Sequence, residues 1–213
     1  MVELSDIDKF SNYTQVSRET ILSLIKFEKK LKYSNKKINL IGKSTANFIW
    51  NRHFLDSAQV IDYIEENTNK IIDLGSGAGF PGIVLGLLAK DRKMPFKIEL
   101  IEKSPRKAIF LREIIRDFNL KASVIEENIF NYHRKLSTDL IISRAFKPLG
   151  VILDFLNKNI INWKKVILFL GKSGKDELLQ ASKIWDLKYK QRVSVTSNDS
   201  LVIEINEINK KVN

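Results

Sequence analysis

A short glycine-rich segment places a carboxylate beside three alternate glycines and carries the strongest chemical signal in the chain. It reads Asp73-Leu74-Gly75-Ser76-Gly77-Ala78-Gly79-Phe80-Pro81-Gly82. Glycines let a ligand approach the backbone closely, and a helix that begins after the turn presents free N–H groups. Glu102, twenty residues beyond Gly82, is placed to accept hydrogen bonds from both hydroxyls of a ribose. We therefore predict a binding site for an adenosine-type cofactor, formed by Asp73, Gly75, Gly77, Gly79, Phe80 and Glu102.

Two cofactors fit this segment to different degrees. The spacing Gly77-x-Gly79-x-x-Gly82 matches the dinucleotide pattern, which is weak evidence when taken alone. The register that begins at Asp73 puts an acid just ahead of the glycines, where it would repel a pyrophosphate. The same acid suits S-adenosylmethionine, whose sulfonium and amino groups are both positive. The segment therefore favours S-adenosylmethionine over a nicotinamide dinucleotide, with a glycine turn that binds nothing as a third interpretation.

The elements that must position these residues alternate between strand and helix from residue 70 onward. Five short apolar runs have the character of strands, and helical patterns lie between them. Two final β-rich runs flank polar residues and predict an antiparallel hairpin. The strands are expected at Lys70–Leu74, Lys97–Ile101, Ala122–Ile125, Asp139–Ser143, Lys165–Leu170, Leu187–Val195 and Leu201–Asn206, with the hairpin turn at Ser197–Ser200. This alternation favours a mostly parallel, doubly wound α/β sheet.

Residues 1–66 carry helical patterns without strand-like alternation, so we expect a helical N-terminal extension before a Rossmann-like domain at residues 67–213. Ser5 and Asp8 have the spacing of an N-terminal capping pair. Apolar residues recur near a period of 3.6 before Tyr33–Asn35, which predicts an amphipathic helix that ends there. Residues 46–55 and 57–65 predict two further short helices.

The composition excludes several kinds of chemistry. The 213 residues include no cysteine, which rules out disulfides, thiolate zinc sites, iron–sulfur clusters and a cysteine nucleophile. Two histidines leave little room for another metal site, so we expect no metal. Apolar runs reach about seven residues, far short of the ~20 that span a bilayer, and the N-terminus is too charged for a secretory signal. We expect a soluble cytoplasmic protein without a membrane partner.

Basic residues outnumber acidic ones by 36 to 25, and the excess is concentrated in two blocks. Residues 26–53 hold eight basic residues against one acidic residue, and residues 131–175 hold nine against two. A one-sided positive surface is typical of nucleic-acid binding, although AT-rich coding also produces lysine-rich chains. On charge alone, two interpretations are equally open: a surface that binds a nucleic acid, and a lysine-rich surface that is only solvated.

Several short strings give the chain a family resemblance that runs from about Phe27 to Asp154. They are Asn39-Leu40, Arg52-His53-Phe54-Leu55-Asp56-Ser57, the glycine segment Asp73–Gly82, Arg106-Lys107-Ala108-Ile109-Phe110-Leu111 and Ser143-Arg144-Ala145-Phe146. In this order they resemble the bacterial ribosomal RNA small subunit methyltransferase G family, also called the glucose-inhibited division protein B family. The resemblance implies a class I S-adenosylmethionine-dependent methyltransferase fold with a seven-stranded sheet. It also implies methyl transfer to N7 of a guanine in the 530 loop of 16S rRNA.

The resemblance places cofactor contacts at Gly75, at Phe80, at the pair Ile129-Phe130 and at Arg144. After the third strand the family usually has an Arg-x-Glu string, where this chain has Asn128-Ile129-Phe130, so side-chain contacts to the adenine change while backbone contacts stay available. After the fifth strand the family often has a Lys-Gly pair. This chain lacks it, and Lys172 is the candidate replacement.

Guanine N7 exposes a lone pair, so its methylation needs no proton removed from the nucleophile, and we expect no general base. Arg144, at the end of the fourth strand, is the expected catalytic residue, because arginine can hold a phosphate or the guanine O6. A structural ion pair is the alternative for Arg144. Arg52, His53 and Lys172 are the expected substrate-binding residues, and a capping or core role is the alternative for His53.

Three functions remain open from the sequence. The leading one is an S-adenosylmethionine-dependent rRNA guanine-N7 methyltransferase that acts, as a monomer, on 16S rRNA or on the small ribosomal subunit. The second is a ribosome-assembly factor that kept the fold and lost activity through its changes at Asn128 and Gly171. The third, a nicotinamide-dependent oxidoreductase, is disfavoured by Asp73.

Overall fold

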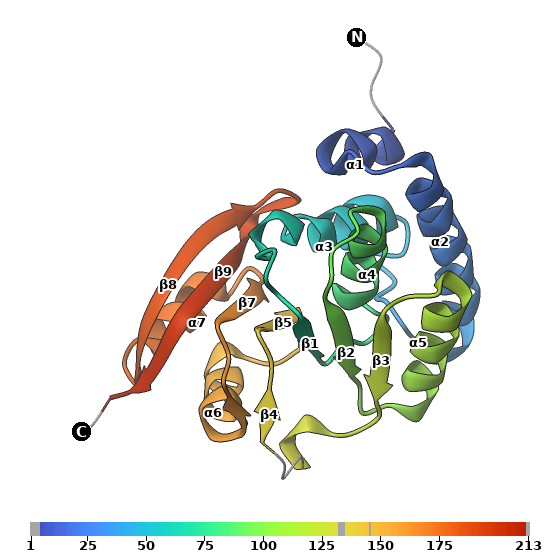
Figure 1. The fold of residues 1–213 in the computed structure, drawn as a ribbon. Helices are drawn as coiled ribbons and strands as arrows, with labels where there is room; N and C mark the ends of the chain where they lie inside the picture. The colour runs from blue at the N-terminus through green and yellow to red at the C-terminus, as the bar shows by residue number, and fades with distance from the viewer. Residues whose placement is uncertain (1–4, 132–134, 145, 212–213) are drawn as a thin grey trace.

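The sheet is wound in two directions from β1, and this reversal creates the crevice in which the candidate site lies (Figure 1). The computed structural model describes residues 5–131, 135–144 and 146–211. Its strand order is β3-β2-β1-β5-β7-β9-β8, and the first five of these run parallel while β9 is antiparallel to β7 and β8. The strands are β1 (Lys70–Leu74), β2 (Lys97–Ile101), β3 (Ala122–Ile125), β5 (Leu140–Arg144), β7 (Lys165–Leu170), β8 (Trp185–Ser194) and β9 (Ser197–Lys210). The predicted seven-stranded, mostly parallel sheet with a C-terminal hairpin is confirmed.

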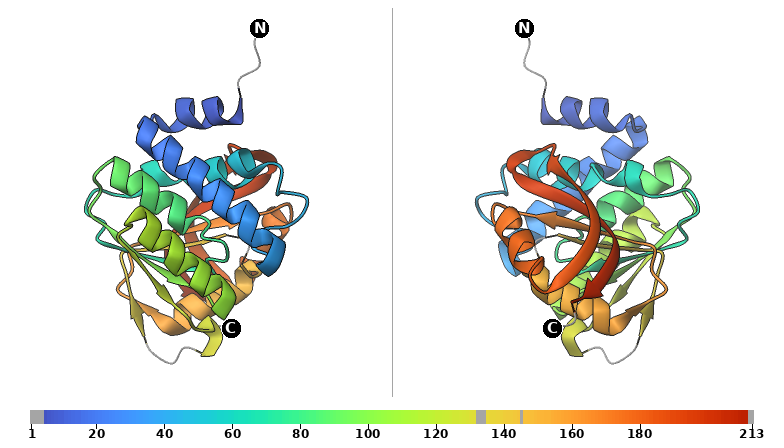
Figure 2. Two further views of the ribbon diagram at one scale, coloured as in Figure 1. Left: turned by 90° about the vertical axis from the view of Figure 1, so that its right-hand side faces the viewer. Right: turned by 90° about the vertical axis from the view of Figure 1, so that its left-hand side faces the viewer.

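Helices cover both faces of this sheet (Figure 2). One layer contains α2 (Arg18–Ile38), α4 (Gly82–Asp91) and α5 (Pro105–Phe118), and the other contains α6 (Leu149–Asn159) and α7 (Gly174–Ala181). A separate pair of short strands, β4 (Leu136–Ser137) and β6 (Ile160–Ile161), forms a small parallel sheet beside the large one.

The strand sequences explain why both faces are covered. Successive strand residues point to opposite faces, so Ile71 and Leu100 join the core of the α4 and α5 layer, while Ile72 and Leu74 join the core of the α6 and α7 layer. A strand that is apolar on both sides must be buried on both sides, which is the usual situation of parallel strands. The apolar runs of the sequence therefore end up at the centre of a three-layer structure.

The helical N-terminal segment is built into this core. Phe27 of α2 packs against the rings of Phe54, Phe80 and Phe110, with ring centroids 5.6, 5.7 and 6.4 Å away. Phe80 belongs to the glycine segment, so the N-terminal helices directly support the loop that follows β1. The division of the chain at residue 66 into an extension and a domain stays a prediction.

The N-terminal helices differ from the predicted ones in their bounds. α1 (Asp6–Thr14) begins with the predicted capping box of Ser5 and Asp8. α2 continues to Ile38, beyond the predicted end, and stops where Asn39 adopts a left-handed conformation. The two predicted short helices are replaced by turns around residues 43–47 and a continuous run of η1 (Trp50–Leu55, a π-helix), α3 (Asp56–Ala58) and η2 (Ile61–Tyr63).

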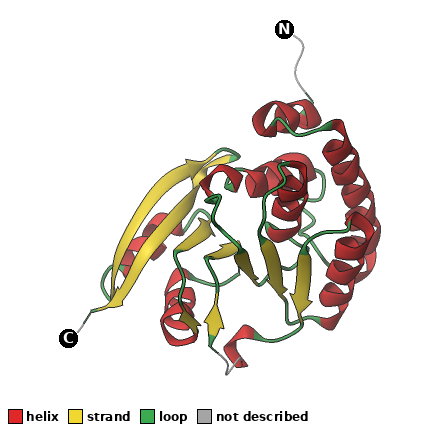
Figure 3. Cartoon of the chain, in the orientation of Figure 1, coloured by secondary structure: helices red, strands yellow, loops and turns green. Residues whose placement is uncertain are grey.

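The hairpin turn lies earlier than predicted. β8 and β9 pair as far as Ser194 and Ser197, which leaves Val195 and Thr196 as the turn and puts the polar stretch of residues 197–200 at the start of β9 (Figure 3). Side chains outside the hairpin fix this position, because Asp56 accepts hydrogen bonds from the hydroxyls of Ser194 and Thr196 at 3.0 and 2.9 Å. Local turn composition does not reveal such a distant anchor.

Within the described ranges, no helix is both long and apolar enough to cross a bilayer. The same residues contain no cluster of three or more histidine, aspartate or glutamate side chains that could hold a metal ion.

Candidate active site

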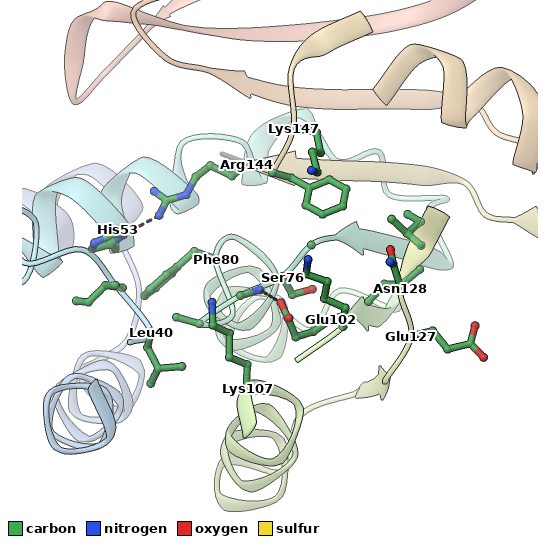
Figure 4. Close-up of a pocket in the computed structure, with 18 of the residues that line it drawn as sticks. Leu40, His53, Ser76, Phe80, Glu102, Lys107, Glu127, Asn128, Arg144 and Lys147 are labelled. Atoms are coloured by element: carbon green, nitrogen blue, oxygen red, sulfur yellow. Dashed lines mark hydrogen bonds between the residues drawn. The ribbon is translucent and has the colours of Figure 1, made fainter. Parts of the chain in front are cut away.

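A cavity of about 450 Å³ opens at the carboxyl ends of β1, β2 and β5 (Figure 4). The strand order reverses here, between β1 and β5, and open α/β sheets bind ligands at such a point. The cavity is lined by eight of the residues predicted from the sequence, namely His53, Gly75, Gly77, Phe80, Glu102, Asn128, Ile129 and Arg144. Leu40, Ile41 and Gly42, which follow α2, close one side of it.

The turn after β1 lies close to the cavity floor because two glycines take backbone conformations that other residues rarely adopt. Gly75 has a φ of +72°, and a Cβ there would overlap the ring of Phe146. Gly77 has a φ of +57°, and its missing Cβ would extend into open space, within 4 Å only of the Gly75 carbonyl oxygen. The segment therefore offers bare backbone to a ligand at Gly77, as the sequence pattern predicts.

Glu102 ties the end of β2 to this turn. Its Oε2 accepts a hydrogen bond from the Gly77 N–H at 2.9 Å, and its Oε1 accepts one from the Ser104 N–H at 2.7 Å. The side chain is buried yet lines the cavity, as Figure 4 shows. A carboxylate oxygen can accept more than one hydrogen bond, so both oxygens can also receive the hydroxyls of a ribose.

Asp73 does not line the cavity. It lies fully buried beneath the turn, where its Oδ2 accepts a hydrogen bond from the Gly82 N–H at 3.0 Å and its Oδ1 has no partner in the described chain. Burial raises the pKa of this carboxyl to about 7, against the lowering effect of the Gly82 hydrogen bond. Asp73 thus holds the start of α4 against the end of β1.

Gly79 is also removed from the cavity. Its Cα packs so closely against Ile83 and Leu111 that a Cβ would collide with the Ile83 side chain. The alternate glycines of the sequence therefore divide into two roles: Gly75 and Gly77 border the cavity, and Gly79 allows the loop to pack on α4 and α5.

The segment after β3 supplies the far side of the cavity. Ile129 is buried in its wall and Asn128 lies on its exposed edge, whereas Glu127 points away from the cavity in Figure 4. Ile129 and Phe130 belong to the short helical turn η3 (Ile129–Asn131), and the Phe130 side chain lies outside the described part of the structure. An apolar residue here suits the face of an adenine ring.

Arg144 reaches across from the end of β5 to the N-terminal helices. Its Nη1 donates to the Arg52 carbonyl oxygen at 2.9 Å and to Asp56 Oδ2 at 2.8 Å, and its Nη2 donates to His53 Nδ1 at 2.6 Å. Figure 4 shows the contact with His53. The guanidinium also lies over the Phe80 ring, 5.3 Å from its centroid. The ion-pair alternative for Arg144 is therefore present in the structure, at the border of the cavity.

Asp56 is the residue that the sequence interpretation missed. Its Oδ1 accepts hydrogen bonds from Gln59, Ser194 and Thr196, and its Oδ2 accepts from Arg144. One carboxylate thus joins the N-terminal helices, the end of β5 and the hairpin turn. Its place inside the Arg52–Ser57 string was a signal, but nothing local distinguishes it from a surface acid.

His53 is buried and neutral. Burial, followed by the nearby positive charge of Arg144, lowers the pKa of its imidazole to about 3. Its ring stacks on Phe80 at 4.8 Å between centroids, and its Nε2 lies 3.0 Å from Thr45 Oγ1. Because Nδ1 accepts from Arg144, the proton of the neutral ring is on Nε2, and His53 links Thr45 to Arg144.

Arg52 and Lys172 lie outside the cofactor cavity. The Arg52 side chain is exposed and reaches the Thr196 carbonyl oxygen at 3.4 Å. Lys172, with 87% of its side chain exposed, follows β7 and lies 3.9 Å from an oxygen of Asp199. The structure therefore brings His53 and Arg144 together with the cofactor residues, and separates Lys172 from them.

The fold and the cavity together define a class of protein. The M. capricolum TrmK structure in complex with S-adenosyl-homocysteine matches this chain with a TM-score of 0.54 at 18% identity, covering 70% of this chain and 66% of that one. M. jannaschii TYW2 in complex with AdoMet matches with a TM-score of 0.54 at 17% identity, covering 78% and 80%. These likenesses show the fold of class I S-adenosylmethionine-dependent methyltransferases.

Sequence comparison identifies the family. The family model for rRNA small subunit methyltransferase G matches residues 20–204. The Ribosomal RNA small subunit methyltransferase G of Pelagibacter ubique is 42% identical over 209 residues, which covers 95% of this chain and 98% of the relative. The Rickettsia akari protein of the same name is 36% identical over 198 residues, covering 92% and 98%. The chain belongs to the rRNA small subunit methyltransferase G family, and the predicted methyltransferase activity and S-adenosylmethionine cofactor are confirmed.

Proposed function

We propose that this protein transfers the methyl group of S-adenosylmethionine to N7 of a guanine in the 530 loop of 16S rRNA. The observation that supports this most directly is the position of Arg144, which a hydrogen-bond network holds at the border of a cofactor-sized cavity. The substrate is 16S rRNA or the assembled small subunit, so the reaction takes place in the cytoplasm, with the enzyme as a monomer.

The residues of the cavity fit S-adenosylmethionine. Glu102 is placed to hold the ribose hydroxyls, Gly77 offers backbone to the ligand, and Ile129 provides an apolar wall for the adenine. Phe80 and the carboxyl end of β1 would border the methionine part. The cofactor, when bound, supplies an electrophilic methyl group on a sulfonium.

The chemistry requires little of the protein beyond alignment. The N7 lone pair forms the new N–C bond, the C–S bond breaks, its electron pair stays on sulfur, and the positive charge moves to the purine. No proton is removed, so the reaction needs no general base and the neutral His53 has no such role. Arg144 acts by holding guanine O6 or a phosphate. Bringing the two reactants into line accounts for up to roughly 7–11 kcal/mol of the barrier.

Basic side chains at the cavity mouth are candidates for contacts with the RNA. Lys103, Lys107 and Lys147 line the cavity rim. On α2, by contrast, Lys30 pairs with Asp117 and Lys32 with Glu28, which neutralises part of the N-terminal basic block. We propose that the rim carries most of the affinity for rRNA, and that residues 1–66 act with the domain at 67–213 by supplying His53 and Asp56.

The proposed function is tested by incubating the protein with labelled S-adenosylmethionine and small subunits from a strain that lacks this activity. We expect label in the rRNA. Cofactor binding with subunit binding but without transfer would instead support the assembly factor that the changes at Asn128 and Gly171 suggested.

A further inference from the structure

A second cavity, of about 240 Å³, adjoins the cofactor cavity. The two cavities share the side chains of His53 and Arg144, so these residues form a partition between them. The second cavity extends over the end of β7, at Phe169 and Gly171, toward the start of β9 at Ser200. None of the cofactor residues described above, apart from the two in the partition, reaches into it.

The volume of the second cavity restricts what can occupy it. It corresponds to about eight water molecules at ~30 Å³ each, the scale of one purine rather than of a base pair. One of its walls is apolar, at Phe169 near the end of β7, which pairs in register with Arg144 and suits the flat face of a base. A nucleotide that enters must therefore be unstacked and unpaired.

Among the charged groups of the second cavity, the two arginines offer donors to a ligand. Asp56 already accepts four hydrogen bonds from the protein, three at Oδ1 and one at Oδ2. Arg144 has five N–H donors, of which three are engaged within the described chain and two are left for a ligand. Arg52 makes one long contact, at 3.4 Å, and adds to the largely buried Arg144 a second guanidinium, an exposed one, at this cavity.

The guanidinium of Arg144 distinguishes between the purines. The N7 and O6 edge of guanine carries acceptors alone, whereas the corresponding edge of adenine carries the N6 amino group, a donor. An adenine in the same orientation would bring its amino group against the guanidinium of Arg144, which has no acceptor for it. A guanine can accept from Arg144 through O6 while its N7 stays free.

We propose that the second cavity receives the target guanine as a single flipped-out base, with its ring against Phe169, O6 on Arg144 and N7 toward the cofactor cavity. This rests on the proposed N7 methylation and adds to it the place of the acceptor base. Arg144 and His53, which separate the two cavities, then face the cofactor on one side and the acceptor base on the other.

Filling the cavity tests this proposal. A Cβ on Gly171 would meet no atom within 4 Å and the backbone there has no positive φ, so Gly171→Leu adds a side chain at the cavity without strain. Gly150, in the first turn of α6, also has open space at its Cβ and lies away from both cavities, which makes Gly150→Leu the matched control. The readouts are the Kd for S-adenosylhomocysteine and kcat/KM for methyl transfer to small subunits.

We expect Gly171→Leu to lower kcat/KM at least tenfold while the Kd changes less than twofold, and Gly150→Leu to alter neither. Unchanged transfer by Gly171→Leu overturns the proposal, and so does a parallel loss of cofactor binding, which would assign the second cavity to the cofactor. Absence of transfer by the unaltered protein is a different result, because it contradicts the proposed function itself.

Base analogues test the contact to O6. Small subunits are reconstituted with inosine or with 2-aminopurine in place of the target guanosine. Inosine keeps O6 and N7 and lacks the 2-amino group, so we expect transfer within about tenfold of guanosine. 2-Aminopurine lacks O6, and we expect a loss of roughly 10- to 100-fold, the scale of one base-edge contact. Full activity with 2-aminopurine would overturn the placement of O6 on Arg144.

Discussion

Arg144 and Asp56 form an ion pair, with Nη1 2.8 Å from Oδ2, that joins the end of a central strand to the N-terminal helices. Both side chains are largely buried, at 14% and 15% exposure. Because Asp56 also holds the hairpin turn, the pair fixes three separate segments around the partition between the two cavities. The helical N-terminus is therefore part of the active-site architecture.

Breaking this pair from either side should destabilise the fold. We expect Asp56→Asn and Arg144→Gln each to lower the free energy of unfolding by about 2–3 kcal/mol, because each leaves a mostly buried charge without its partner. The double variant should lose less than the sum of the two, by ~1–3 kcal/mol. Urea denaturation of the four proteins measures this coupling, and strictly additive losses would contradict it.

His53 should make the fold sensitive to acid. Its pKa in the folded protein is about 3, below the ordinary 6.5, so the unfolded chain binds a proton that the folded chain excludes. Stability is therefore complete above about pH 6.5 and falls as the pH drops toward 3, by about 2–3 kcal/mol at pH 4.5. The variant His53→Gln should flatten the dependence of stability on pH in this range, which denaturation midpoints between pH 4 and 7 measure. An unaltered slope of stability against pH would show that other titrating groups dominate it.

Glu102 should control cofactor affinity. Glu102→Gln removes the negative charge and one of the two acceptor oxygens that serve two backbone N–H groups and, in the proposed complex, the ribose hydroxyls. We expect the Kd for S-adenosylhomocysteine to rise ~10- to 100-fold. The matched control is Glu127→Gln, since Glu127 borders the same cavity but points away from it. Calorimetric titration should show little change for the control. Equal effects in both variants would indicate a general charge effect instead of a ribose contact.

Lys172 should contribute to RNA affinity without affecting the cofactor. It is almost fully exposed and follows β7 near the second cavity, so Lys172→Gln should reduce the salt dependence of subunit binding by about 0.7–0.9 in the log–log slope, the value for one phosphate contact. Lys30→Gln changes the net charge equally but removes a lysine already paired with Asp117. A slope that changes equally in both variants would rule out a specific contact at Lys172.

The sequence predicted the elements that local patterns specify. Strands β1, β2, β3 and β7 have the predicted bounds, because mainly apolar runs end at polar or glycine residues there. The hairpin turn was misplaced because Asp56, far away in the sequence, anchors it. Arg144 could be placed at the end of its strand, but its three partners come from another segment and leave no local pattern.

Asp73 shows the same limit within the glycine segment. The spacing of an acid and alternate glycines correctly predicted the cofactor class, yet the acid binds the Gly82 N–H beneath the turn instead of lining the cavity. A pattern of residue types can thus identify a loop while leaving open which of its side chains face the ligand. That division depends on close packing, as the contact of Gly79 with Ile83 illustrates.

The most direct test of the account is to map the methyl group after transfer to small subunits that lack it. Treatment that cleaves the chain specifically at 7-methylguanosine, followed by primer extension, locates both the nucleotide and the modified atom. We expect one strong stop in the 530 loop, absent without S-adenosylmethionine. Label that is incorporated without such a stop, or a stop elsewhere in the rRNA, would contradict it.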